Sequence, residues 1–137
     1  MDDIYDITII GGGPSGLYSA FYAGLRDLKT KIIEYKSTLG GKLHVYPEKI
    51  IWDIGGLPAT PAHKVMENLI EQGLTFNPTV CLNTKVDFIT KKEDVFVIET
   101  STGEKHCSKK VVVAVGGGII SPIKLHVEGA EKYEVSN

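Results

Sequence analysis

The feature that most constrains the fold is the N-terminal stretch IYDITIIGGGPSG, which spans residues 4–16. Its apolar, β-branched run is typical of a buried parallel strand. A glycine-rich segment follows, and from Leu17 onward apolar residues recur at helical spacing. The stretch therefore predicts a strand, a glycine turn and a helix, with the pattern G-x-G-x-x-G at Gly11, Gly13 and Gly16.

Each residue of this turn has a physical reason to be there. Gly11 permits a tight exit from the strand, Gly13 lets the backbone approach a pyrophosphate closely, and Gly16 lets the helix pack against the sheet. Pro14 suits the first helical turn, where its missing N–H removes a donor that would be unpaired anyway. The remaining N–H groups and the helix dipole favour a pyrophosphate at this point.

A second strand is predicted at Thr30–Tyr35. Glu34 lies at its end, about twenty residues after the first glycine, where a dinucleotide-binding unit places an acid. Its carboxylate can accept hydrogen bonds from both ribose hydroxyls of an adenosine. Because it would repel a 2′-phosphate, the site is expected to prefer FAD or NAD over NADP.

The rest of the chain contains a helix, a meander and a third strand. Thr60 and Pro61 are expected to open the helix as N-cap and first residue, and Gly73 to follow it at the C′ position. The glycines of Leu39-Gly40-Gly41-Lys42 and the loop at 50–58 are equally consistent with a ligand-lining turn and with a simple connection. Three short segments with intervening turns predict an antiparallel three-stranded meander at 84–90, 95–100 and 104–107. The tail from 122 to 137 is expected to be a loop near a domain boundary.

The meander and the strand after it distinguish between nucleotides. The apolar run at 110–115 predicts a parallel strand that returns beside the first one and ends in a second glycine cluster, Gly116 to Gly118. Two glycine-rich edges at neighbouring strand ends make a long crevice, which suits FAD better than NAD. The predicted fold is α/β, a Rossmann-like FAD-binding fold with a parallel sheet, helices and an antiparallel three-stranded β-meander.

Composition excludes several function classes. The 137 residues carry a net charge of −2, which offers no broad attraction to nucleic acid or to an anionic membrane. No apolar stretch reaches membrane-spanning length, and no signal peptide is expected. Cys81 and Cys107 form no C-x-x-C pair, so a cytoplasmic location with buried or inert thiols is expected. The four histidines lack metal-ligand spacing, and neither a metal site nor an acid–base or nucleophilic catalytic residue is predicted.

Together these motifs resemble the FAD domain of flavoprotein reductases with two dinucleotide folds. The stretch from Tyr46 to Gly56, YPEKIIWDIGG, is similar to the thioredoxin-reductase-like ferredoxin (flavodoxin)–NADP reductases of the pyridine nucleotide-disulfide oxidoreductase superfamily. The resemblance implies that Ser15 lies in the pyrophosphate turn, Glu34 at the ribose and Val86 at the adenine end. It implies flavin contacts for the turns and loops that carry Gly41, Lys42, Tyr46, Gly116 and Ile120. The family more often has glutamine where Lys42 stands.

The resemblance also implies a reaction, in which electrons pass from NADPH through FAD to ferredoxin or flavodoxin. In the resembling enzymes an NADP domain follows, and a C-terminal segment returns to the FAD domain. Residues 1–137 are therefore expected to be an N-terminal FAD-binding fragment that does not oxidise NADPH by itself and that belongs to a homodimer. Two alternatives stay open: the FAD domain of a thioredoxin reductase, and a non-catalytic nucleotide-binding module.

Overall fold

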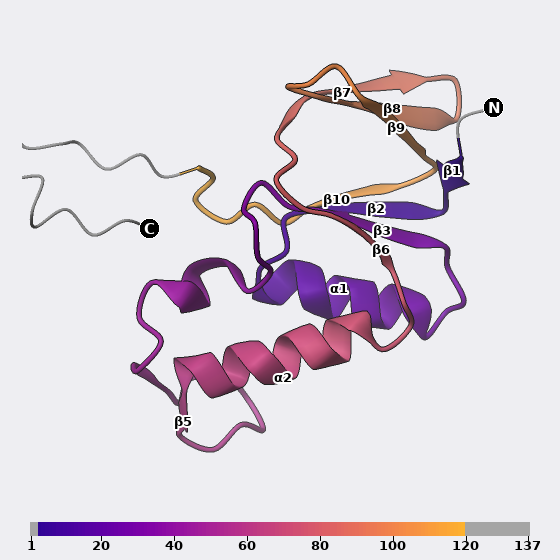
Figure 1. The fold of residues 1–137 in the computed structure, drawn as a ribbon. Coiled ribbons are helices and arrows are strands. Elements are labelled where there is room, and N and C mark those ends of the chain that lie inside the picture. The colour runs from indigo at the N-terminus through magenta and orange to yellow at the C-terminus, as the bar shows by residue number, and fades with distance from the viewer. Residues whose placement is uncertain (1–2, 120–137) are drawn as a thin grey trace, which may run out of the picture.

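The fold is built on a parallel sheet that is covered on both faces (Figure 1). The structure is a computed structural model, and it describes residues 3–119. Four strands form the parallel sheet in the order β10 (Val111–Val113), β2 (Ile7–Ile10), β3 (Thr30–Ile33) and β6 (Thr79–Cys81). The predicted return of the 110–115 strand to the side of the first strand is confirmed, because β10 and β2 pair in parallel.

Two helices lie on one face of this sheet. They are α1 (Pro14–Gly24), which follows the glycine turn as predicted, and α2 (Ala62–Leu74). The predicted ends of α2 were wrong. Thr60 and Pro61 form the short strand β5, which pairs with β4 (Ile50–Ile51), and the Thr60 hydroxyl donates to the Pro58 carbonyl instead of capping the helix. Gly73 lies inside the helix. Glycine is needed there because a Cβ would press on Leu17 of α1.

The predicted meander is confirmed on the opposite face of the parallel sheet. Its antiparallel strands are β7 (Val86–Lys92), β8 (Val95–Thr100) and β9 (Lys105–Ser108). The sequence did not indicate a fourth member, β1 (Ile4–Tyr5), which pairs in parallel with β9. The N-terminal stretch therefore contributes to both sheets, with a break at Asp6 between β1 and β2.

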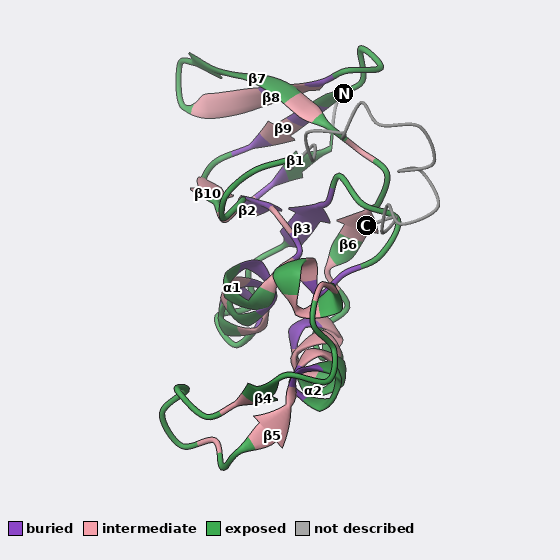
Figure 2. Cartoon of the chain, turned by 90° about the vertical axis from the view of Figure 1, so that its left-hand side faces the viewer, coloured by how far each residue is buried: buried purple, intermediate pink, exposed green. Residues whose placement is uncertain are grey.

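Two apolar layers cover the isoleucines at the carboxyl ends of β2 and β3. Towards the helices, Ile9 and Ile32 pack with Leu17 and Ala20 of α1. Towards the meander, the alternate residues of both strands pack against Ile98 of β8. Residues of a strand alternate between its faces, so a sheet covered on both sides buries successive residues, here Ile9 and Ile32 on one face and Ile10 and Ile33 on the other. Figure 2 shows the buried residues concentrated on β2 and β3.

A polar cluster also lies between the two sheets. The Lys31 side chain is buried on β3, with its Nζ 3.0 Å from His106 Nδ1 and 4.2 Å from the centre of the Tyr5 ring. Burial lowers the pKa of His106 below its ordinary value, and the Lys31 charge lowers it further. The histidine is therefore neutral near pH 7 and can accept a hydrogen bond from the lysine.

Candidate functional site

Three turns meet at the carboxyl ends of β2, β3 and β10. The first follows β2, where Gly11 has a φ of 109° and lies so close to β10 that a Cβ there would overlap the carbonyl oxygen of Ala114. The Ala114 N–H donates to the Ile10 carbonyl at 2.8 Å, which fixes β10 against this strand end. Strand ends at which loops converge are where open α/β sheets bind ligands.

The first turn leads directly into α1. Pro14 occupies the first helical turn, as predicted, and the structure shows Gly13 as the N-cap. A Cβ on Gly16 would overlap the carbonyl oxygen of Gly11 and would lie 3.4 Å from Ile9 Cγ2. Glycine is therefore required at position 16, because any side chain would push the helix away from the turn and the strand.

Backbone N–H groups at the start of α1 remain available to a ligand. The Gly11 N–H donates to the Ile33 carbonyl at 2.8 Å, and the Gly12 N–H donates to Glu34. The first N–H groups of a helix have no carbonyl four residues earlier within it, and no side chain caps α1. No hydrogen bond outside the helix is recorded for the N–H of Gly13, Ser15 or Gly16 among residues 3–119. These donors, together with the helix dipole, suit an anion such as a diphosphate.

The second turn, which begins at Leu39, packs onto the first. The Gly40 N–H donates to the Gly12 carbonyl at 2.8 Å. Gly41 has a φ of 60°, and a Cβ on it would lie 2.8 Å from the Cα of Gly13. Both the left-handed conformation and this close approach require glycine at position 41. The turn therefore belongs to the same site as the glycine motif, and it leads into the short 3₁₀-helix η1 (Gly41–His44).

Glu34 holds the first turn in place. The residue is only 8% exposed, and its Oε2 accepts the Gly12 N–H at 2.6 Å. Its Oε1 accepts the Lys36 N–H at 2.8 Å. An ionised carboxylate has about four acceptor positions, so lone pairs remain for ribose hydroxyls. The sequence indicated only a ribose contact for Glu34, so this structural role was missed.

The third turn follows β10 and approaches the second. Gly116 has a φ of 58°, and a Cβ on Gly117 would lie 3.2 Å from the Nζ of Lys42. The Lys42 side chain therefore lies between η1 and the glycine cluster that ends β10. The predicted convergence of the two glycine clusters is confirmed, with Lys42 beside the second.

A cavity of about 230 Å³ opens next to these turns. It brings together three of the predicted site residues: Pro14, Lys42 and Tyr46, the last of which is 63% exposed. Four residues that the sequence analysis did not assign to the site complete its lining: Leu43, Lys49, Ile51 and Ala62. Ile51, in β4, lies in the loop at 50–58 that the sequence left open as a ligand-lining segment, whereas Ala62 belongs to α2, where no local motif indicated a site.

Val86, another predicted site residue, does not line this cavity. Val86 is half-buried at the start of β7 and packs in the layer between the two sheets. Its segment is tied to the site indirectly, because the Thr84 N–H donates to the Glu34 carbonyl at 2.9 Å. Ile120 and the tail from 122 lie outside the described residues.

Potential metal ligands and thiols can be located within the described residues. Within residues 3–119, no three His, Cys, Asp or Glu side chains gather as a metal site. Cys81 and Cys107 are free and half-buried, and burial raises the pKa of the Cys81 thiol. Neither described helix is long and apolar enough to cross a bilayer.

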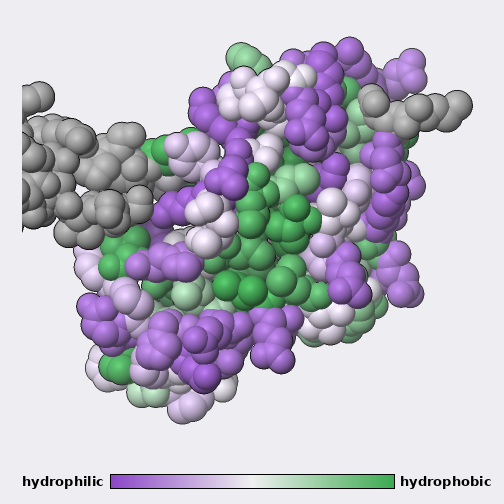
Figure 3. Space-filling view, in the orientation of Figure 1, coloured by the Kyte–Doolittle hydropathy of each residue, from purple (hydrophilic) through white to green (hydrophobic). Residues whose placement is uncertain are grey.

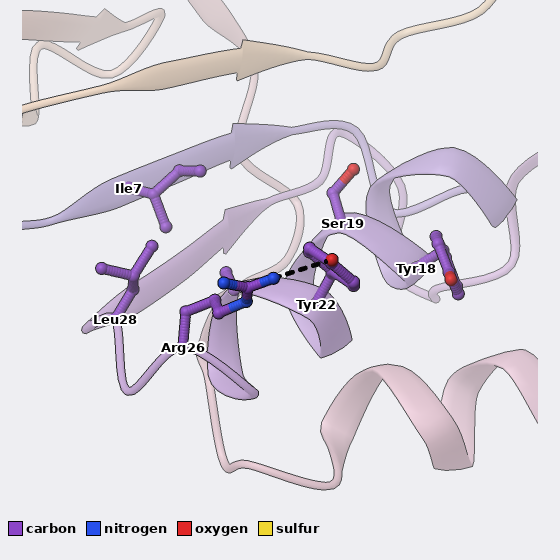
Figure 4. Close-up of a pocket in the computed structure, with 7 residues that line it drawn as sticks. Ile7, Tyr18, Ser19, Tyr22, Arg26 and Leu28 are labelled. Atoms are coloured by element: carbon purple, nitrogen blue, oxygen red, sulfur yellow. Dashed lines mark hydrogen bonds between the residues drawn. The ribbon is translucent and has the colours of Figure 1, made fainter.

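A second concavity, of about 330 Å³, lies away from the turns (Figure 4). It is lined by Ile7 at the start of β2, by Leu28, and by residues of α1, and Arg26 Nη2 donates to the Tyr22 hydroxyl across it at 3.0 Å. Figure 3 shows apolar residues gathered between the meander and the helices on the face seen in Figure 1. The concavity in Figure 4 is larger than the cavity beside the glycine turns. It lies at the opposite end of β2 from the glycine turn, so it is not the candidate site.

Known proteins resemble the chain over nearly all of its length. The family model described as "Pyridine nucleotide-disulphide oxidoreductase" matches residues 5–137. The chain is 63% identical over 137 residues to ferredoxin–NADP reductase 3 of Lysinibacillus sphaericus (strain C3-41), covering all of the chain and 39% of that protein. It is 60% identical to ferredoxin–NADP reductase 1 of Bacillus anthracis, covering 99% of the chain and 39% of that protein. The chain thus spans about two fifths of the length of these relatives.

Solved structures agree on the fold. A thioredoxin reductase from Streptococcus pyogenes MGAS5005 matches with a TM-score of 0.71 and 25% identity, over 82% of this chain and 35% of that one. Thioredoxin reductase from Lactococcus lactis matches with a TM-score of 0.72 over 94% of this chain and 40% of that one, and its 23% identity supports the fold alone. The predicted Rossmann-like class is confirmed, as is the resemblance drawn from the sequence motifs.

Proposed function

The chain belongs to the pyridine nucleotide-disulphide oxidoreductase family, and on that premise we propose that it is the FAD-binding portion of a ferredoxin–NADP reductase. In this proposal, electrons pass from NADPH through FAD to ferredoxin or flavodoxin. The observation that carries it is the convergence of three glycine turns on the N-terminus of α1. The two relatives described above, which are 63% and 60% identical to the chain, are both named ferredoxin–NADP reductases.

The residues at the three turns fit FAD. The free N–H groups of the first turn would bind the diphosphate, and the unused lone pairs of Glu34 would accept the ribose hydroxyls. Tyr46 and Lys42, which line the same cavity as Pro14, would lie beside the flavin-bearing half. Bound flavin would supply hydride acceptance and one-electron release, while the protein orients it and excludes water.

The same proposal divides FAD binding and NADP binding between two parts of the enzyme. Residues 1–137 would supply the FAD-binding domain, and NADP would bind within the part of the relatives that this chain does not cover. The two free, half-buried cysteines are consistent with a reducing cytoplasm. Assembly as a homodimer is part of the proposal. The chain alone is expected to show no sustained NADPH-dependent dye reduction, and such activity in a pure sample would contradict this division.

Thermal unfolding with and without FAD, combined with a visible spectrum, tests the proposal. A ligand present at a hundred times its dissociation constant stabilises the folded state by about 2.7 kcal/mol, so the melting temperature should rise. Flavin absorbance should also remain with the protein after desalting. Riboflavin, which lacks the diphosphate and adenosine, serves as the control and should give little shift. A chain that neither binds nor is stabilised by FAD would instead support a non-catalytic module.

A thioredoxin reductase remains the second candidate, because solved thioredoxin reductases share this fold, one of them at 25% identity. The two candidates share the FAD site and differ in the acceptor. The discriminating measurement uses the full-length protein encoded with this domain, comparing reduction of ferredoxin with reduction of a thioredoxin disulfide. Faster reduction of thioredoxin would overturn the ferredoxin assignment and leave the FAD site unaffected.

A further inference from the structure

The two sheets are joined by a buried polar contact as well as by an apolar layer. Lys31 of β3 and His106 of β9 meet between them, with Lys31 Nζ 3.0 Å from His106 Nδ1. Both residues are buried, so water does not surround either polar group. β3 belongs to the parallel sheet and β9 to the sheet of the meander, and no strand of one sheet pairs with a strand of the other. The Lys31–His106 contact is therefore a junction between two separately hydrogen-bonded sheets.

This junction contains a buried cation without a buried carboxylate. Among residues 3–119, no ion pair of Lys31 is recorded, and its Nζ lies 4.2 Å from the centre of the Tyr5 ring of β1. The carboxylate recorded beside His106 is that of Glu104, which is 3.7 Å from His106 Nε2, on the other side of the ring from Lys31, and 63% exposed. The titratable and charged groups around the pair, from every element packed against it, are Tyr5, Lys29, Cys81 and Glu104.

A neutral His106 fits this junction, whereas a protonated one does not. The neutral ring can accept a hydrogen bond from the Lys31 ammonium at Nδ1. A proton on Nδ1 would turn this acceptor into a donor, so two cations would face each other at 3.0 Å inside the protein. Glu104 compensates little, because solvent screens an exposed carboxylate. Burial, and then the Lys31 charge, lowers the pKa of His106 in the closed junction, which agrees with this geometry.

The apolar contact that surrounds the junction is the smaller of the two that cover the parallel sheet. On the meander side, the buried residues are Ile10, Ile33 and Ile98. On the helix side, five buried residues pack together, and neither Lys31 nor His106 is among them. The meander side can therefore open at a lower cost than the helix side, because less apolar surface would be exposed to water.

We propose that the Lys31–His106 junction is a pH-sensitive contact, and that proton uptake by His106 parts the meander from the parallel sheet while the helix side stays packed. The closed pair carries one positive charge, whereas a separated and hydrated pair carries two below about pH 6.5. The open state thus binds one more proton, and its population relative to the closed state should rise about tenfold between pH 7.5 and pH 5.5. The inference does not rest on the proposed function, because the junction lies near the start of β3 and the candidate site lies at its end.

Cysteine labelling measures the opening. The probe is Ile98→Cys in a chain that also carries Cys81→Ser and Cys107→Ser, because Ile98 is fully buried and pairs with His106 in the register of β8 and β9. Ile32→Cys in the same background is the matched probe on the helix side, where Ile32 is also fully buried. The reagent is dithiodipyridine, a disulfide that labels thiols in mild acid. Each labelling rate is divided by that of a small free thiol at the same pH, so the ratio reports the opening alone.

The expected result has three parts. Labelling at position 98 should rise about tenfold from pH 7.5 to pH 5.5. It should also exceed labelling at position 32 at both pH values, with little dependence on urea below the unfolding transition. With His106→Gln, which keeps an acceptor for Lys31 and takes up no proton, the rate at position 98 should stay within about twofold over the same range. His63→Gln, at an exposed histidine of α2, is the control and should leave the rise unchanged.

Three results would overturn the proposal. The first is a rate at position 98 that does not change with pH. The second is a rise that persists in His106→Gln, because the proton would then bind another group. The third is equal labelling at positions 98 and 32 with equal urea dependence, because only the whole domain would then unfold. If Ile98→Cys does not fold, Ser108→Cys replaces it with the same expectations, since Ser108 is fully buried on the same face of β9 as His106.

Discussion

Replacing Glu34 with glutamine tests whether the acid at the end of β3 shapes the site before any ligand binds. The substitution conserves volume and removes the charge. In the structure the carboxylate accepts two backbone N–H groups, from Gly12 at 2.6 Å and from Lys36 at 2.8 Å. A glutamine has one acceptor oxygen, and its NH₂ group must face the other N–H. One of the two hydrogen bonds is therefore lost, and two donors are left opposed.

The size of the effect follows from burial. Glu34 is 8% exposed, so water cannot replace the lost partner freely. A hydrogen bond to a charged group contributes about 1.5–3 kcal/mol, and an unpaired buried donor costs a similar amount. We expect Glu34→Gln to lower the free energy of unfolding by about 2 kcal/mol. For a domain of this size, that corresponds to a melting temperature lower by about 8 °C.

The measurement is thermal and urea unfolding without ligand, with hydrogen exchange at the Gly12 amide as a local readout. Glu71→Gln is the matched control, because Glu71 is exposed on α2 and should change the melting temperature by no more than about 1 °C. A Glu34→Gln protein that melts within about 1 °C of the unmodified chain, with unchanged Gly12 exchange, would refute the argument. Because no ligand is present, a loss of ribose contacts cannot produce the effect.

Three further substitutions test other parts of the structure. Gly16→Ala should lower the free energy of unfolding by about 3 kcal/mol, because its Cβ would overlap the Gly11 carbonyl, whereas Gly55→Ala, with open space around it, should stay within about 0.5 kcal/mol; equal urea midpoints would contradict this packing. The pKa of His106 is lowered in the folded state, so its contribution to stability is complete above the unfolded pKa of about 6.5 and declines as the pH falls below that value. His106→Gln, which keeps an acceptor for Lys31, should flatten that decline, and an unchanged pH profile of unfolding would count against the buried neutral histidine. Thr8→Val should raise the free energy of unfolding by about 1 kcal/mol, because the buried Thr8 hydroxyl has no partner within the described residues; a destabilised variant would reveal a missed hydrogen bond.

Local pattern was enough to predict much of the fold. The turn and α1 could be predicted because glycines and a proline stand between an apolar strand and a helical repeat, all within one short stretch. The meander could be predicted because its turns contain typical turn residues. The return of β10 to β2 followed from its apolar run, since such a strand needs cover on both faces.

Contacts between distant segments were not visible in the sequence. The β1–β9 pairing is two residues long, too short to produce a periodic pattern. Gly73 was read as a helix end because glycine is common there, but here it stays inside α2 to make room for Leu17. Lys31 and His106 lie far apart in sequence, and nothing local marks either as buried.

The site itself was predicted in outline. Glycine spacing and Glu34 indicated a nucleotide turn, and the contact between Gly13 and Gly41 shows that the second glycine pair belongs to it. The sequence left open whether the turn at Leu39–Lys42 lines a ligand or simply connects two elements. The answer depends on a tertiary contact between segments that lie far apart in the sequence. The part of the cavity wall that α2 supplies also depends on a tertiary contact.

The mutual packing of the three turns has a consequence for the kinetics of binding. Gly40 is hydrogen-bonded to Gly12, Gly41 lies against Gly13, and Gly11 lies against Ala114. Contacts within the chain itself therefore hold the backbone of the three turns, and little ordering is expected on association. The observed association rate should therefore rise linearly with dinucleotide concentration, with no plateau from a preceding conformational step.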